Sequence, residues 1–233
     1  MAEKPPLNQP PPSTNPLLDS RFLRFAKRLR PDLERMSKER QLLGLSDIIA
    51  IIYAAPLTLG GLIWLVLTTD WVLFREYPLE IFLATGLIIL FERLRFFLIF
   101  EIRDNRYGSS DGSLSGIVLW SLVFVIGPTA FWLAIILTLI EFAFTWRQST
   151  STADRWNRVR NAIFNLAGET LVPLIALTIY TSLGGEYPLP HLNLNTVAIA
   201  FVTLLSNFAI LALLWAGYLF NYTRLQADRK AHV

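Results

Sequence analysis

Apolar segments about as long as a lipid bilayer is thick dominate this sequence. The first, Ile48–Thr69, has the length of about 20 residues that a helix needs to cross the hydrocarbon, and comparable apolar segments lie at 79–96, 114–146 and 196–220. Backbone groups inside hydrocarbon have no water to bond, so such segments form helices. With 53% hydrophobic and 17% charged residues, the 233-residue chain is typical of a polytopic helical membrane protein.

The longest apolar stretch, Leu114–Trp146, is broken by Gly127 and Pro128, and it has two interpretations. It forms either a hairpin of two membrane segments or one continuous span. The hairpin makes basic segments alternate with segments poor in Lys and Arg at successive membrane ends, as the positive-inside rule requires, whereas one span would place Arg147–Arg160 outside. We therefore predict an all-α bundle of six membrane segments, with a Gly-Pro turn in the hairpin and both termini in the cytoplasm.

The N-terminal part precedes the membrane domain. Residues 1–16 contain six prolines, which predicts a disordered tail. Residues 17–45 predict two basic amphipathic helices, Leu17–Leu29 and Asp32–Leu43, separated by Pro31. These helices are expected to lie in the cytoplasmic headgroup layer, and a solvated linker is the alternative.

The membrane domain is predicted to comprise residues 46–223. Ser46 and Asp47 have the side chains of good N-cap residues for its first helix. The Gly- and Ser-rich segment Arg103–Ser113 predicts a turn region between the second and third segments. Residues 224–233 form a basic tail, which is expected in the cytoplasm.

A stripe of polar side chains enters the membrane with the fifth predicted helix, which begins at about Ser151 or Asp154 and ends at Ser182. The stripe recurs at spacings of three, four and four residues, so its members share one helix face. These members are Arg158, Asn161, Asn165 and Glu169. A carboxylate at the centre of a membrane helix costs roughly 2.5–3.5 kcal/mol on insertion scales. The stripe is therefore expected to face other helices or water.

Glu141 and Asn207 complete the candidate ligand site. Glu141 lies five residues before Trp146, at a depth similar to that of Glu169, and Asn207 lies in the middle of the last span. The functional hypothesis is a ligand or proton site made by the stripe and these two residues. The structural alternative is a set of hydrogen bonds and one ion pair between helices that only fix helix register.

Several classes of chemistry are disfavoured. Cysteine is absent and the two histidines are His191 and His232, which argues against thiolate or His-built metal sites. The sequence contains no P-loop, dinucleotide fingerprint or hydrolase motif. We predict a protein that is not an enzyme, with no catalytic and no metal-binding residues, and the cofactor is left unknown. Its Lys and Arg flank apolar spans, which indicates contact with the lipid bilayer and not with nucleic acid.

Four short features stand in a characteristic order between about residues 113 and 220. They are a Gly-Pro turn, a Trp in the following loop, a Phe-Asn pair that opens the next helix, and a Gly-Gly pair that ends it. The residues are Gly127, Pro128, Trp156, Phe164, Asn165, Gly184 and Gly185. This part of the chain resembles the multi-pass membrane sensor region that precedes HD-GYP and GGDEF domains in bacterial cyclic-di-GMP signalling proteins. Asn207 falls where the last helix of that family often carries Asn.

The resemblance implies a multi-pass sensor of the bacterial inner membrane. The cytoplasmic output domain of that family is missing before Val233, which implies a protein partner or an output domain in trans. We therefore expect a non-enzymatic sensor or interaction module that binds a small or lipophilic ligand within the bundle. Two alternatives stay open: a solute transporter or the substrate-binding subunit of one, and an accessory membrane subunit of a larger respiratory or photosynthetic complex.

Overall fold

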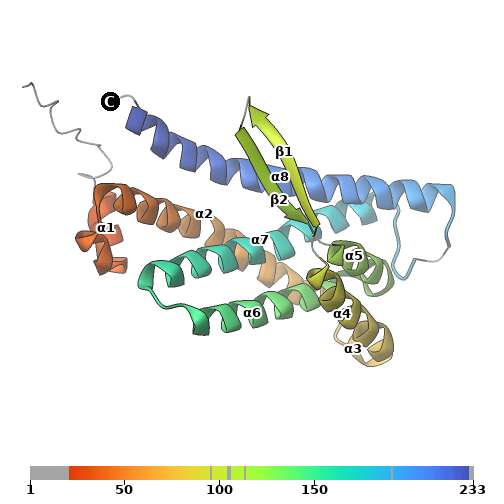
Figure 1. Cartoon of the computed structure of the whole chain (residues 1–233). Coiled ribbons are helices and arrows are strands. Elements are labelled where there is room, and N and C mark those ends of the chain that lie inside the picture. Colours follow the sequence, from red (N-terminus) through yellow and green to blue (C-terminus); the bar gives the residue numbers. More distant parts are fainter. Residues whose placement is uncertain (1–20, 95, 104–105, 113, 190, 231–233) are drawn as a thin grey trace, which may run out of the picture.

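The computed structural model describes residues 21–94, 96–103, 106–112, 114–189 and 191–230 of the chain, as long helices with one small sheet (Figure 1). In chain order the elements are α1 (Arg21–Leu29), η1 (Pro31–Arg35), α2 (Lys38–Thr68), α3 (Leu73–Glu76), α4 (Pro78–Arg93), β1 (Phe96–Arg103), β2 (Arg106–Gly112), α5 (Ser115–Ile126), η2 (Gly127–Ala130), α6 (Phe131–Gln148), α7 (Thr152–Ser182) and α8 (Leu194–Lys230). The elements η1 and η2 are short 3₁₀ helices.

Four helical segments are long and apolar enough to cross a membrane, which confirms the predicted helical membrane protein in its coarse form. They are Arg40–Thr68, Ser115–Gln148, Thr152–Ser182 and Leu194–Phe220. The shortest has 27 residues and extends for about 40 Å, more than the ~30 Å of a bilayer core. Large apolar side chains on these helices are exposed, such as Leu67 and Leu213, and lipid tails are the natural cover for them.

Helix α7 lies in the middle of the bundle. It packs against α2, α6 and α8, and Figure 1 shows it between α8 and α6. Gly61 allows α2 to approach closely, because a Cβ at Gly61 would lie 2.7 Å from the backbone nitrogen of Leu171 and would overlap Thr170. Pro56 lies inside α2 and Pro173 inside α7, and neither proline ends its helix. The polar face of α7 is thus fixed by neighbours on three sides.

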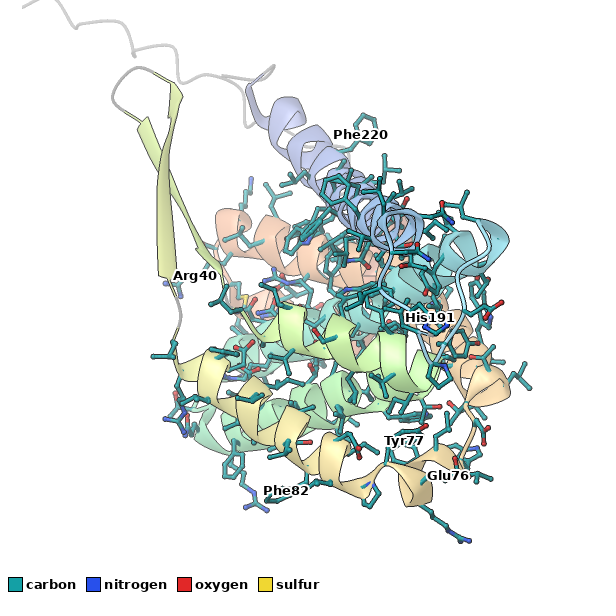
Figure 2. The ribbon with its side chains drawn as sticks, turned by 90° about the vertical axis from the view of Figure 1, so that its right-hand side faces the viewer. Arg40, Glu76, Tyr77, Phe82, His191 and Phe220 are labelled. Carbon is teal, nitrogen blue, oxygen red and sulfur yellow. The ribbon has the colours of Figure 1, made fainter. Side chains whose placement is uncertain are left out.

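The bundle has two distinct ends, which we call the α1 end and the η2 end. The α1 end holds α1, η1 and the connection from α6 to α7, and α8 finishes there (Figure 1). The η2 end holds η2 and the loop before α8, and Figure 2 looks onto this end, where Tyr77 and His191 lie. Backbone bonding ties the connections together here, since the Leu189 N–H donates to the carbonyl of Phe124 at 2.8 Å.

The predicted turn at Gly127 is present, and its backbone requires glycine. Gly127 has φ 61° and ψ −146°, a region essentially restricted to glycine. A Cβ there would also lie 2.6 Å from Cδ2 of Tyr187. Trp120 and Phe131 meet across the turn with their ring centroids 5.8 Å apart. This end of the bundle therefore has a packed aromatic and aliphatic core.

The two helices on either side of this turn do not form a simple antiparallel pair. Helix α5 packs mainly along α4, and in Figure 1 it is seen nearly end-on while α6 runs across the view. Helix α4 has 16 residues and α5 has 12, and each is shorter than the about 20 residues of a full crossing. The six predicted segments thus correspond to four long helices and one shorter pair, α4 and α5.

Strands β1 and β2 form an antiparallel hairpin in place of the predicted end of the second span and the predicted turn region. Phe96 pairs with Gly112 at one end of the ladder, and Arg103 pairs with Arg106 at the other. The second span, predicted at 79–96, ends earlier, at Arg93. The strand β1 is rich in Phe and Ile, residues that favour a pleated strand, which explains why the helix does not continue.

The N-terminal segment folds back onto the start of α2, and two boundaries predicted there are wrong. The predicted helix Asp32–Leu43 is replaced by the single 3₁₀ turn η1, and α2 begins at Lys38. The predicted N-cap residues Ser46 and Asp47 consequently lie inside α2, because good helix formers precede them. The predicted tail at 1–16 lies outside the described residues.

Candidate functional site

Helix α7 begins where the sequence places it and carries the predicted polar stripe. It starts at Thr152, and the Ser151 hydroxyl caps it by accepting the backbone N–H of Asp154 at 3.1 Å. Arg158 receives support from the same turn, because its Nε donates to Asp154 Oδ2 at 3.3 Å. Both partners of this ion pair are partly exposed, so the pair contributes about 0–1 kcal/mol to stability.

A polar pocket of about 130 Å³ lies between α6 and α7. It brings together four of the six residues that the sequence predicts for the site. These are Glu141 from α6 and Arg158, Asn161 and Asn165 from α7. Thr138 and Thr145 of α6 line the same pocket. The pocket therefore combines one carboxylate, one guanidinium and two amides on the walls of two neighbouring helices.

A second, smaller pocket of about 50 Å³ lies on the other side of the same stripe, between α7 and α8. Asn161 and Asn165 line it too, together with Arg160 and an aromatic cluster. The cluster consists of Phe164, Trp215 and Tyr218, whose ring centroids are 4.7 to 6.0 Å apart. Because the two pockets share both asparagines, we treat them as one feature, the α7 groove, with α7 as its floor and α6 and α8 as its walls.

Asn165 is exposed on the floor of the α7 groove. Within the part of the chain that the structure describes, its amide makes no hydrogen bond. The carboxylate of Glu141 is also exposed and without a hydrogen-bond partner in that part. Asn161 differs, because its Oδ1 accepts from the guanidinium of Arg160, at 3.0 Å from Nη2. The groove thus offers one free amide and one free carboxylate to a visitor.

Glu169 lies one helical turn beyond Asn165 and lines neither pocket. Its Oε1 accepts a hydrogen bond of 2.6 Å from the hydroxyl of Thr138 on α6. Its Oε2 is buried and has no partner among the described atoms. For Glu169 the structure therefore places an interhelical hydrogen bond where the sequence predicts a ligand contact. Thr138 connects this bond to the groove, since it also lines the pocket between α6 and α7.

Asn207 of α8 does not join the other predicted residues. It lies half-buried in the middle of α8 and lines neither pocket of the α7 groove. Helix α8 meets the groove nearer its C-terminal half, through Trp215 and Tyr218. The sequence placed Asn207 at membrane depth but carried no information about which face of α8 packs against α7.

An ion-pair chain at the α1 end is absent from the sequence prediction. Asp47 of α2 accepts from Arg160 Nη1 at 2.6 Å and from Arg30 Nη1 at 3.5 Å. Arg30 also donates to Asp32 at 3.2 Å, and its side chain is 3% exposed. Trp156 of α7 covers the Arg30 guanidinium, with 6.0 Å from its carbon to the ring centroid. The chain thus joins the segment after α1 to both α2 and α7.

Comparisons of the chain with protein-family models, with curated proteins and with solved structures found no significant match. The resemblance to the membrane region of cyclic-di-GMP signalling proteins therefore stays a prediction. Among the described residues, no three His, Cys, Asp or Glu side chains gather where they could hold a metal ion. The α7 groove is the feature from which we argue function.

Proposed function

We propose that this protein is a non-enzymatic membrane sensor module, which binds the polar headgroup of an amphiphile in the α7 groove and acts through a protein partner. The observation that carries the proposal is the exposed, unpaired amide of Asn165 on a membrane-crossing helix. An amide moved from water to an apolar medium without a hydrogen bond costs roughly 2–7 kcal/mol. A headgroup that bonds to this amide removes that cost.

The charges of the groove define the class of headgroup. Arg158 and the amide N–H groups are donors that suit a phosphate, and Glu141 on the facing helix is an acceptor that suits an ammonium group. The Arg158–Asp154 pair is weak enough to be exchanged for a phosphate oxygen. A zwitterionic headgroup with a primary ammonium group, such as that of phosphatidylethanolamine, satisfies both walls.

The same proposal includes the orientation of the chain. The α1 end, with the basic segment around Arg147–Arg160, faces the cytoplasm, and both termini lie on that side. The shorter helices α4 and α5 supply the second and third of six membrane segments. In this orientation the α7 groove opens in the cytoplasmic leaflet of a bacterial inner membrane, where phospholipid headgroups reach it laterally.

Native mass spectrometry of the protein in mild detergent, after incubation with phosphatidylethanolamine, tests the proposal. The parent chain should retain the lipid, and Asn165→Leu should lose it, because leucine removes both amide groups from an exposed position. Asn207→Leu is the matched control, since it removes an amide at membrane depth outside the groove. Equal retention by the parent and Asn165→Leu would overturn the proposal, as would no retention by the parent.

The headgroup series distinguishes the roles of the two walls. Phosphatidylglycerol lacks the ammonium group and phosphatidylcholine lacks ammonium N–H donors, so both should be retained less than phosphatidylethanolamine. Glu141→Gln should reduce this preference, because an amide no longer attracts the ammonium charge. Equal retention of all three lipids by the parent would contradict the zwitterionic assignment.

The unpaired amide of Asn165 also favours a second candidate function, that of an accessory subunit in a larger membrane complex. There, a polar side chain on a partner's transmembrane helix bonds to Asn165. Gentle extraction from the native membrane separates the two functions. The sensor keeps a bound lipid, whereas the accessory subunit arrives in a large complex and loses its partner in Asn165→Leu.

A further inference from the structure

Arg160 belongs to two structural units at once. Its side chain lines the α7 groove beside Asn161, and it also donates to Asp47 at the start of α2. Asp47 in turn accepts from Arg30, the residue between α1 and η1. Hydrogen bonds therefore run without a gap from the groove to the N-terminal lobe, which we define as α1 together with η1.

We infer that the N-terminal lobe is the output element of the module, and that Arg160 transmits occupancy of the α7 groove to it. The input of this inference rests on the proposed function, because it needs a ligand in the groove. The output does not rest on it, since the bonds from Arg160 to the lobe exist in the structure without a ligand.

Competition for Asn161 provides the physical step. Oδ1 of Asn161 accepts from Arg160 Nε at 3.2 Å and from Nη2 at 3.0 Å, so it holds the guanidinium in place. A headgroup that binds Asn161 turns this amide toward itself and removes both contacts. The guanidinium then loses the support that directs Nη1 onto Asp47, and the lobe keeps fewer bonds to α7.

The lobe is built to move when this connection weakens. Leu23 and Ala26 of α1 pack with Leu33 of η1 and Leu45 of α2 in a small cluster separate from the main core. Apart from this cluster, Arg30 is the contact that reaches α7, through Asp47 and Trp156. Because few apolar residues hold the lobe, the loss of one polar connection shifts its docking equilibrium.

The lobe also presents a surface that a partner can read. On its outer side α1 exposes Arg24, Phe25, Arg28 and Leu29. A face with two arginines and two large apolar side chains suits an acidic amphipathic helix or an anionic membrane surface. Release of the lobe changes the distance of this face from the bundle, which is the signal we assign to it.

Distance measurement between two spin labels tests the inference on the full chain in nanodiscs. The chain has no cysteine, so Arg24→Cys on α1 and Ala153→Cys on α7 are the only labelling sites. Asp47→Asn should lengthen and broaden the distance distribution, because the neutral amide no longer binds two guanidinium groups. Asp154→Asn is the matched control, since it removes a carboxylate that pairs with Arg158 and not with Arg160.

A second variant keeps the test decisive if Asp47→Asn folds poorly. Arg160→Gln should shift the distribution in the same direction, and the double variant should shift it no further than either single variant, because both remove one connection. An unchanged distribution in a folded Asp47→Asn or Arg160→Gln chain overturns the inference, whatever the groove binds.

Lipid addition tests the input separately. Nanodiscs of phosphatidylcholine are compared with nanodiscs that also contain phosphatidylethanolamine, and the added lipid should shift the parent distribution toward that of Asp47→Asn. Asn165→Leu should show no shift. If mass spectrometry detects bound lipid and the labels do not move, the readout is wrong and the proposed function stands. If no lipid binds, the proposed function falls and the readout falls with it.

Discussion

Asp47 and Arg160 lie 113 positions apart in the chain, and Oδ1 of Asp47 meets Nη1 of Arg160 at 2.6 Å. This pair fixes the start of α2 against α7, at the depth where α7 leaves the basic connection and enters the bundle. Its exposure is low, with 14% for the Asp47 side chain and 23% for that of Arg160. The pair is therefore a structural connection and not a surface ion pair.

Replacing Asp47 by Ala should destabilise the protein by about 3 kcal/mol, because it leaves the buried guanidinium of Arg30 without its partner on α2. Chemical unfolding in detergent micelles measures this change. Asp154→Ala removes a partly exposed carboxylate, and its effect should stay within about 1 kcal/mol. Equal effects of the two substitutions would show that Asp47 carries no special load.

Gly61→Ala should destabilise the contact between α2 and α7 by about 1–3 kcal/mol, because the added Cβ overlaps Thr170. Gly60→Ala is the matched control, since a Cβ at Gly60 has no atom within 4 Å. In that exposed helical position, alanine should stabilise by up to about 1 kcal/mol. The opposite signs are read from unfolding midpoints, and a shared sign would contradict the packing described for Gly61.

Gly127→Ala should be more harmful than Gly184→Ala. Both glycines have positive φ, 61° and 88°, so alanine strains each by about 1–3 kcal/mol. Only at Gly127 does the new Cβ also collide with a ring, that of Tyr187, whereas Gly184 has open space. The two variants are compared by thermal unfolding. A larger loss for Gly184→Ala would show that the turn is not packed as the structure has it.

Thr138→Val should cost about 1–3 kcal/mol, because it removes the only hydrogen bond of the Glu169 carboxylate among the described residues. Glu169→Leu in the same chain should recover most of this loss, since no carboxylate is then left unpaired. Thr178→Val is the control, because its hydroxyl bonds only to a carbonyl of its own helix. Unfolding of the four variants in micelles gives the coupling directly, and additive effects would argue against the interhelical bond.

Labelling from each side of the membrane tests the proposed orientation. Single cysteines at Ser151 and Leu192 lie at opposite ends of the bundle in an otherwise cysteine-free chain. In intact cells, a membrane-impermeant maleimide should label Leu192→Cys and spare Ser151→Cys. After the membrane is opened, both should react. Labelling of Ser151→Cys in intact cells would reverse the assignment of the two ends.

Helical spacing explains why part of the site was predictable. Asn161 and Asn165 are one turn apart, so the sequence alone places them on one face, and Glu141 follows from its depth relative to Trp146. These inferences need only the geometry of single helices. Asn207 fails the same reasoning because its role depends on the rotation of α8 against α7, which is set by packing at Trp215 and Tyr218.

Long-range pairing explains most of what was missed. Asp47 looks like an N-cap residue when only its neighbours are considered, and nothing near it in sequence points to Arg160. The orientation of α5 depends likewise on α4, which precedes it by the whole length of the β-hairpin. The β-hairpin itself was hidden because the apolar start of β1 continues the pattern of α4. Apolarity alone does not separate a helix from a strand.

The position of α8 has a mechanical consequence. Its most apolar window is 11% buried, compared with 44% for α7, so lipid surrounds α8 on most sides. A helix held by protein along one side adjusts its tilt to the thickness of the hydrocarbon around it. Since α8 forms one wall of the α7 groove, a thinner or thicker bilayer changes the width of that groove, and lipid chain length tunes binding independently of headgroup chemistry.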